Sequence, residues 1–259
     1  MFLLFPFLVN CIDDKEAFDL LTPDVPKELI PQIGPRLKFS AKFRNYQKIE
    51  QDFRIIYGEE TADSFITKGD TCAEKILTFC NSQEISWKPY FSIQLSDDHS
   101  LLALQMLPLV LPSGLVRNKR GKNLRASRAE ALSAFIDIQP LCTLPLQVGT
   151  NLPHYLETCQ AERQKTQPYI LVLGDRLKPS QTFVVPDGVA LEAGTLLKAC
   201  DICFKAAYIL DVHYPKQCQT TWEFIQKYFF QLGDGKGKSI TSPGVRTLRT
   251  FLEASVESS

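Results

Sequence analysis

Three cysteines and one histidine in the C-terminal third of the chain have the residue types and spacing that come nearest to metal chemistry. They are Cys200, Cys203, His213 and Cys218. Zinc sites are built from these residue types, and a C-x-x-C pair is also typical of redox sites. Here the pair lies inside an apolar helical pattern, and a mostly apolar stretch separates Cys203 from His213. The pattern favours buried thiols, so we expect neither a metal nor a cofactor.

Other signatures of catalysis are weak. The segment LGDGKGK, residues 232–238, contains glycines but lacks the G-x-x-x-x-G-K-[ST] pattern that cradles phosphates, and it follows a predicted helix rather than a strand. Asp211 and His213 lie near a predicted helix end, where a surface pair or a cap is more typical than an acid-base pair. Neither G-x-S-x-G nor H-E-x-x-H occurs. We therefore expect a protein that is not an enzyme.

The strongest run of charge is residues 114–128, GLVRNKRGKNLRASR. Its candidate nucleic-acid contacts are Arg117, Lys119, Arg120, Lys122, Arg125 and Arg128. Such a run is typical of phosphate-binding segments, but no aromatic residue is interleaved to stack on bases. A solvated loop before a helix has the same composition, and Ser127-x-x-Glu130 has the spacing of a capping box that would start this helix. Both interpretations stay open.

The composition indicates that any attraction to a charged partner must come from a local cluster of charge. The chain has 259 residues, 44% of them hydrophobic and 22% charged, with 29 basic and 29 acidic side chains. Such a chain can bury a sizeable core, and its balanced charge gives no overall field toward nucleic acid or membrane. Residues 2–9 are apolar or proline, but the run is too short to cross a bilayer. We interpret it as a buried first element, or as a start inside a longer protein, and expect no membrane association.

The cysteines indicate a reducing compartment. All eight are scattered along the chain, mostly on apolar faces of predicted helices, and no Asn-x-Ser/Thr sequon occurs. We expect an intracellular protein, without a distinction between nucleus and cytoplasm.

The first half of the chain is predicted to be helical. Residues 46–67 read as two helices split at Gly58, and Asp70-Thr71 would cap a third. Residues 101–112, LLALQMLPLVLP, are hydrophobic all round and predict a buried helix that is kinked or ended at Pro108. The helix that follows Ser127 is predicted to extend through Ile136.

The second half adds strands. PYILVLG (168–174) and TFVVPDG (182–188) predict an antiparallel hairpin. Residues 194–233 predict two helices separated at Pro215, with Gly233 as a C-terminal cap, and Pro243 starts a last helix. The expected fold class is α+β and mainly α, bundle-like, with a small antiparallel β-hairpin in the C-terminal half.

We divide the chain into a helical region (1–112), a basic and proline-rich connector (113–150) and a C-terminal hairpin plus helix-pair module (151–259), or take it as one continuous domain. The C-terminal third resembles a module at the carboxy end of uncharacterised vertebrate proteins that are abundant in fish, some of which are similar to sterile alpha motif domain-containing protein three. Tyr214-Pro215 followed by TWEFIQ (221–226) carries the resemblance most specifically, and residues 46–256 are covered. The resemblance implies no catalytic residues, and no sterile alpha motif is recognisable here.

These observations predict a non-catalytic protein-interaction module with an unidentified protein partner, part of a larger or mobile-element-like gene product. The alternative is a nucleic-acid-binding protein that uses residues 117–128. A binding assay with the basic residues replaced separates the two, because phosphate contacts make affinity steeply dependent on salt.

Overall fold

The computed structural model describes residues 48–83, 90–91, 98–113, 115–117, 123–139, 151–161, 167–186, 188–233 and 242–254. Over these residues the protein is α+β and mainly helical, with a four-stranded mixed sheet in the C-terminal half. The predicted fold class is confirmed. The predicted buried first element at residues 2–9 lies outside the described residues, as does the part of the LGDGKGK segment after Gly233. No described helix is both long and apolar enough to cross a membrane.

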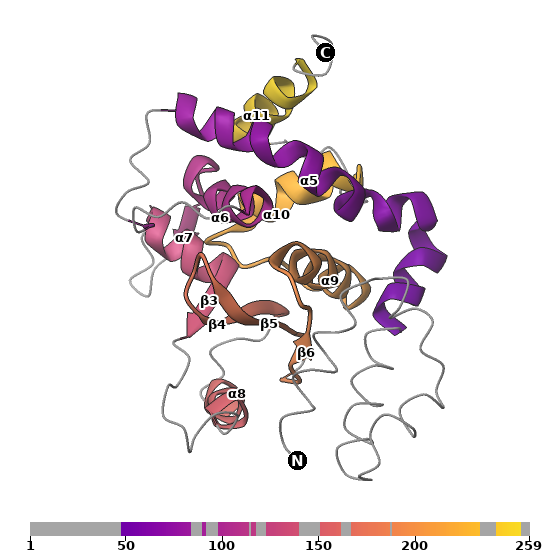
Figure 1. Ribbon diagram of the computed structural model, residues 1–259, viewed down its shortest axis with the longest axis vertical. Coiled ribbons are helices and arrows are strands. Elements are labelled where there is room, and N and C mark those ends of the chain that lie inside the picture. Colours follow the sequence, from indigo (N-terminus) through magenta and orange to yellow (C-terminus); the bar gives the residue numbers. More distant parts are fainter. Residues whose placement is uncertain are drawn as a thin grey trace.

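A long helix crosses the upper part of the molecule, and a shorter one precedes it at the right of Figure 1. A helix over residues 48–57 ends at Gly58, whose φ of 84° is the left-handed conformation that glycine tolerates, and α5 (Glu59–Ser82) follows. The predicted break at Gly58 is confirmed. The predicted third helix is wrong, because α5 runs without interruption through Asp70.

Close packing explains why α5 carries a glycine in its middle. A Cβ at Gly69 would lie 2.6 Å from a methyl carbon of Leu197. Leu197 belongs to α9 (Leu196–Ile209), so the missing side chain lets the two helices approach each other. The glycine marks a crossing of helices rather than the end of one.

The predicted buried helix is α6 (His99–Val110), and Asp98 caps it by accepting a hydrogen bond from the Leu101 amide at 2.8 Å. Pro108 lies inside this helix, which continues for two residues beyond it. The predicted helix pair is also present, as α9 and as α10 (Gln219–Phe224) continuing into a π-helical turn, η1 (Ile225–Phe229). Gln231, not Gly233, has the positive φ after this turn, at 54°, so the predicted glycine cap is wrong.

The sheet has the strand order β3-β4-β5-β6. The predicted hairpin is β4 (Tyr169–Gly174) and β5 (Pro179–Val185), which are antiparallel, and β6 (Leu191–Glu192) adds a short edge. On the other edge β3 (Ile136–Gln139) pairs in parallel with β4. The helix before it, α7 (Arg128–Phe135), ends one residue earlier than predicted, because Ile136 begins this strand.

The two faces of the sheet bury different sets of side chains. Ile170, Val172 and Val184 face the main core, where α9 packs on β4 and β5. Leu171, Phe183 and other residues of the opposite face pack against α8 (Asn151–Ala161), which Figure 1 shows below the sheet. Because α8 also connects the parallel strands β3 and β4 in the sequence, it is the crossover helix that a parallel pair requires.

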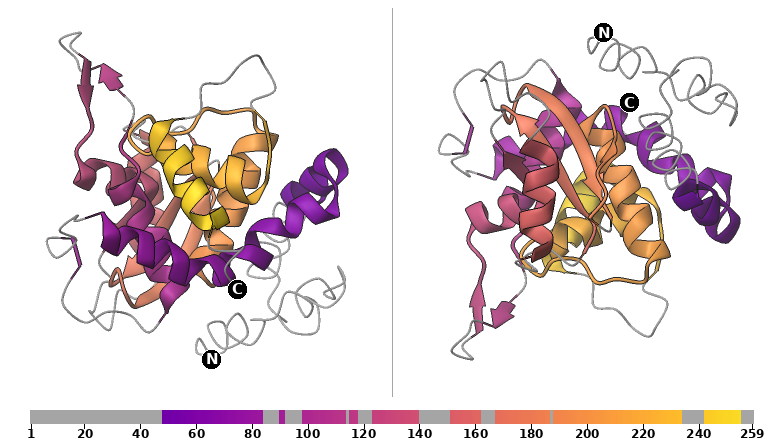
Figure 2. Two further views of the ribbon diagram at one scale, coloured as in Figure 1. Left: turned by 90° about the horizontal axis from the view of Figure 1, so that it is seen from above. Right: turned by 90° about the horizontal axis from the view of Figure 1, so that it is seen from below.

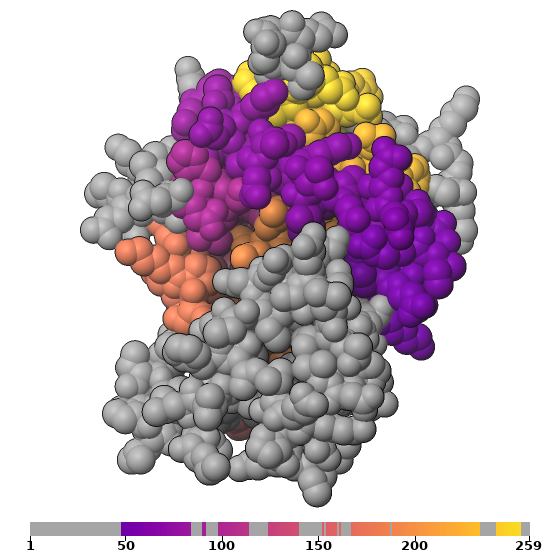
Figure 3. Space-filling model, turned by 45° about the vertical axis from the view of Figure 1, so that its right-hand side comes forward, coloured from indigo at the N-terminus to yellow at the C-terminus, as the bar shows by residue number. Residues whose placement is uncertain are grey.

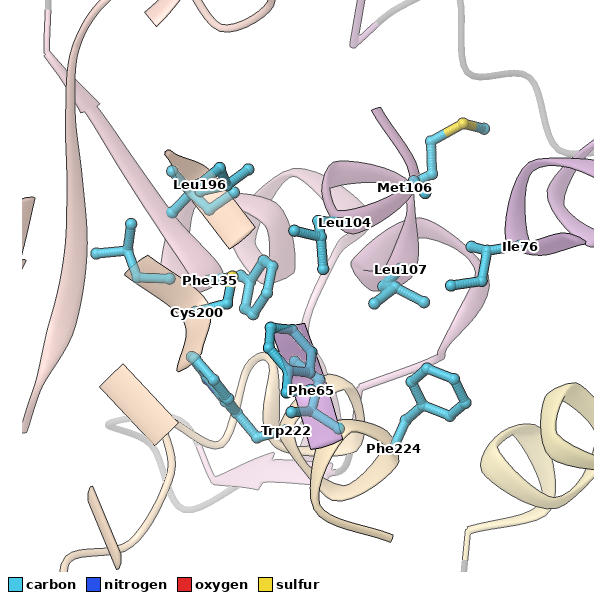
Figure 4. Packing of buried hydrophobic residues seen from close by; sticks show 14 of the residues in the cluster. Phe65, Ile76, Leu104, Met106, Leu107, Phe135, Leu196, Cys200, Trp222 and Phe224 are labelled. Carbon is cyan, nitrogen blue, oxygen red and sulfur yellow. The ribbon is translucent and has the colours of Figure 1, made fainter. Parts of the chain in front are cut away.

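Aromatic and aliphatic side chains together fill the main core between α5, α6, α7, α9 and α10 (Figure 4). Phe204 of α9 stacks on Phe230 with their ring centroids 4.0 Å apart, and Phe135 contacts Trp222 edge-on at 5.0 Å. This one core contains residues from both sides of the connector, from Phe53 to Leu252.

One lysine lies inside this apolar core. The side chain of Lys205 is 1% exposed, and its Nζ lies 2.8 and 3.0 Å from the carboxylate oxygens of Glu50 and 2.7 Å from Oδ2 of Asp201. Glu50 also accepts from Arg54, which in turn bridges to Asp63 of α5 at 2.6 Å. Burial disfavours the charged lysine, but the two carboxylates outweigh it and raise the pKa of Lys205.

We expect Lys205→Met to destabilise the fold by about 3–5 kcal/mol, because it removes the cation that two poorly solvated carboxylates share and leaves Glu50 with Arg54 alone. Urea unfolding measures the loss. The matched control is Arg249→Met, which breaks a pair with the same i,i+4 spacing to Glu253 but with both side chains about half exposed, and it should cost about 1 kcal/mol or less. Equal losses in the two variants would contradict a special role for the buried lysine.

The same ion pair predicts a dependence on alkaline pH. Because the folded state raises the pKa of Lys205 above its ordinary value of 10.5, the contribution is fully present below the unfolded-state pKa and is lost as pH rises through the folded-state pKa. The difference in unfolding free energy between the wild type and Lys205→Met should therefore be largest at neutral pH and shrink at strongly alkaline pH. A difference in unfolding free energy that stayed constant with pH would contradict the role of the charged lysine.

Candidate nucleic-acid interface

The basic segment contains two short paired strands that the sequence analysis did not predict. Strand β1 (Leu115–Arg117) pairs antiparallel with β2 (Asn123–Arg125). Figure 2 shows the two strands projecting from the body of the molecule, at the upper left of its left-hand view. We call these two paired strands, residues 115–117 and 123–125, the basic hairpin. Sequence analysis missed it because each strand has only three residues, too few for an alternation of apolar and polar positions to be visible.

The basic hairpin lies in a stretch without carboxylates. No Asp or Glu occurs from residue 99 to residue 129, whereas all six candidate arginines and lysines fall between 117 and 128. In a chain with equal numbers of basic and acidic residues, this arrangement concentrates positive charge in one stretch of the sequence. Such a local charge can attract a polyanion even though the net charge is zero.

Hydrogen bonds from side chains to carbonyl groups fix the base of the basic hairpin. On the side that leads into β1, Thr220 of α10 donates its hydroxyl to the Pro112 carbonyl at 2.9 Å. Across the base, the buried Ser113 donates to the Ala126 carbonyl at 3.0 Å, which ties the two ends of the hairpin together. The hairpin is therefore attached to the core on a fixed stem.

A helix start holds the other side of the stem. Ser127 caps α7 in the predicted capping box: its hydroxyl accepts from the Glu130 amide at 3.2 Å, and the Glu130 carboxylate accepts from the Ser127 amide at 2.7 Å. These hydrogen bonds to the backbone and the hydroxyl of Ser127 lower the pKa of Glu130. Next to it, Arg128 donates Nε to the Leu109 carbonyl at 3.0 Å, near the C-terminal end of α6.

The structure thus separates the six candidates. Arg117 and Arg125 belong to the strands, and Arg125 is exposed. Arg128 lies in α7, where its guanidinium satisfies a helix carbonyl, so its first role is to hold the stem. The remaining three, Lys119, Arg120 and Lys122, fall outside the described residues.

The thiols considered for metal chemistry are inside the core. Cys200, Cys203 and Cys218 are buried, whereas His213 is exposed. Burial raises the pKa of the Cys218 thiol to about 12, and it also raises the pKa values of Cys200 and Cys203. The described residues contain no group of three or more side chains that could hold a metal ion.

A polar contact that sequence analysis missed joins the crossover helix to the sheet. Tyr155 of α8 donates its hydroxyl to Asp137 of β3, close to the buried Cys159 and to Tyr169. Burial, and then the hydrogen bond to Asp137, raise the pKa of Tyr155, so the phenol keeps its proton and acts as a donor that holds α8 in place. No spacing in the sequence could have found it, since the two residues meet only through the crossover.

Apolar exposure is concentrated on the helix over residues 48–57. Its Ile55 and Ile56 are 74% and 60% exposed. This helix and α5 form the indigo and purple surface at the right and top of Figure 3. These are the two most exposed large apolar side chains among the described residues.

Neither a family model, nor a curated protein, nor a solved structure matches the chain. The resemblance of the C-terminal third to the vertebrate module stays a prediction, and the argument for function rests on the molecule's own geometry.

We expect Arg128→Ala to lower the free energy of unfolding by about 1 kcal/mol, because it removes a charge-assisted hydrogen bond to a helix carbonyl. Arg125→Ala, three residues away on the exposed hairpin, should change it by no more than about 0.5 kcal/mol. Thermal and urea unfolding of the two variants measure the difference. If Arg125→Ala proved the more destabilising, the assignment of Arg128 to the stem would be wrong.

Proposed function

We propose that this chain is a non-catalytic binding module whose binding element is the basic hairpin and whose partner is nucleic acid. The observation that carries the proposal is the projection of a two-stranded element, on a fixed stem, from the one long stretch that combines six basic residues with no acidic one. Phosphate oxygens are the ligands that arginine and lysine side chains bind most often in nucleic-acid complexes.

A non-catalytic role is supported by how the described titratable groups are used. The buried Lys205 is saturated by two carboxylates, and Tyr155 donates to Asp137 across a packed contact. Buried thiols with raised pKa values are poor nucleophiles, since the thiolate is the reactive form. Each of these groups stabilises the fold. The basic hairpin, which projects from the body of the molecule, is therefore the element that we assign to binding.

Replacing the basic residues of the two strands, and those that lie between the strands in the sequence, should abolish most of the binding. The test variant changes Arg117, Lys119, Arg120, Lys122 and Arg125 to alanine. The slope of log affinity against log salt should fall by about 0.9 for each phosphate that the variant no longer neutralises on duplex DNA, or by about 0.7 on a single strand. Fluorescence anisotropy with labelled nucleic acid, measured over a range of salt concentrations, gives both affinity and slope.

A charge-matched control separates binding at the hairpin from general attraction. It changes five exposed basic residues elsewhere to alanine, so both variants lose five positive charges: Lys48, Lys178, Lys216, Arg246 and Arg249. The proposal requires this control to bind nearly as well as the wild type. Equal weakening in the two variants would contradict a specific interface. Capture of cell partners that survives nuclease treatment, with no binding to purified nucleic acid, would instead favour a protein-interaction module.

A further inference from the structure

Arg176 is a partly buried cation that has no ion-pair partner among the residues that the structure describes. It lies in the turn between β4 and β5, where burial lowers the pKa of its guanidinium and the nearby charge of Asp175 only opposes the shift. Burial acts in the same direction on Arg54 and Lys205, but each of them contacts two carboxylates, which outweigh it and raise the pKa. A guanidinium that lacks both full hydration and a bound carboxylate is stabilised by an anion.

The buried Gln105 of α6 holds this arginine in place. It is the only polar side chain in residues 101–110, LLALQMLPLV, and it is 1% exposed. Its Nε2 donates to the Arg176 carbonyl at 2.7 Å, and its Oε1 accepts from Nη1 of the Arg176 guanidinium at 3.3 Å. A buried amide has to be hydrogen-bonded, and both ends of this one bond to Arg176. The guanidinium is therefore positioned before any ligand binds, which lowers the entropic cost of binding.

These contacts leave one edge of the guanidinium open. Gln105 bonds to Nη1, whereas Nε and Nη2 have no hydrogen-bond acceptor among the described residues. The N–H groups of Nε and Nη2 point in parallel from the edge opposite Nη1, and such a pair forms two hydrogen bonds with the two oxygens of one anion. The ring of the buried Phe91 lies 6.0 Å from Cζ of Arg176, within reach of a cation–π interaction.

We propose that Arg176 is a binding site for a carboxylate group, which accepts two hydrogen bonds from the Nε–Nη2 edge. One guanidinium matches the single charge and the planar shape of a carboxylate. A phosphate group carries close to two negative charges, and the charge of Asp175 disfavours the second. The carboxylate belongs to a small organic acid or to an acidic side chain of a peptide. This site goes beyond the proposed function, because it shares no residue with the basic hairpin and takes a different ligand.

The test titrates the full chain with sodium acetate at constant ionic strength and follows the backbone amide signals of residues 175–178 by NMR. We expect these signals to shift and to saturate. In Arg176→Lys acetate should bind about tenfold or more weakly, which is the loss expected for one charge-assisted hydrogen bond. The amide signal of Arg246, an exposed arginine in α11 (Pro243–Ala254), serves as the control and should change only slightly and without saturation.

Two results would overturn the site: equal, unsaturable responses beside Arg176 and Arg246, or wild-type affinity for acetate in Arg176→Lys. Inorganic phosphate, titrated in the same way, should bind more weakly than acetate, and tighter binding of phosphate would overturn the assignment to a carboxylate. A tetrapeptide blocked at both ends and carrying one glutamate identifies the source of the carboxylate. Tighter binding of the peptide than of acetate assigns the site to an acidic segment of a partner, and equal or weaker binding assigns it to a small acid.

Asp175→Asn provides a second variant, which keeps the arginine. Oδ1 of Asp175 accepts a hydrogen bond from the Leu177 amide at 2.8 Å, and the side-chain oxygen of asparagine can accept the same bond, so the turn is retained. Removal of the negative charge beside the guanidinium should tighten acetate binding several-fold. An arginine that only held the turn would predict no such change. Unchanged affinity in Asp175→Asn would therefore show that acetate is not bound by this guanidinium.

Discussion

The arrangement of the helices depends on a lysine that is charged inside an apolar core. Lys205 belongs to α9, the helix that contacts α5, α6 and the sheet, and its Nζ lies 5.7 Å from the centre of the Phe53 ring. A cation at this depth is tolerable only where carboxylates meet it, and one of them, Glu50, comes from the helix over residues 48–57. The buried charge therefore fixes how that helix packs on α9, because Glu50 must reach Lys205. Contacts between aromatic rings alone would allow the helix to shift.

The same principle, in which a polar group finds a specific partner at the edge of an apolar core, positions the basic hairpin. Thr220 and Ser113 are both buried, and each satisfies a carbonyl group beside the hairpin. Each of these hydrogen bonds satisfies a buried hydroxyl and a carbonyl oxygen at once, and it therefore holds the two segments together. The direction of the hairpin is consequently set by the core helices and not by its own short strands, which form few hydrogen bonds.

The sequence predicted those parts of the fold that depend on local chemistry. A helix cap such as Ser127 acts within one turn, so its spacing is visible in the chain. The third helix predicted at Asp70-Thr71 was wrong, because α5 continues past Gly69, whose place against Leu197 is set by a residue remote in sequence. The strand at Ile136 and the basic hairpin were missed for a related reason. Segments of three or four residues carry no reliable periodicity, and only pairing with another segment makes them strands. The basic charge of the site was visible in the sequence, but its geometry was not.

The parallel pair β3–β4 sets an order for the assembly of the sheet. Strands β4 and β5 are joined by a short turn at residues 175–178, so their pairing closes a small loop. Pairing of β3 with β4 must enclose residues 140–168, including α8, and the entropy lost on closing a loop grows with its length. The antiparallel hairpin can therefore form early as a template, whereas the edge strand joins late, when Tyr155 of α8 reaches Asp137. A chain emerging from the ribosome exposes β3 before its partner strand exists, and until β4 follows, this edge has to be kept from pairing elsewhere.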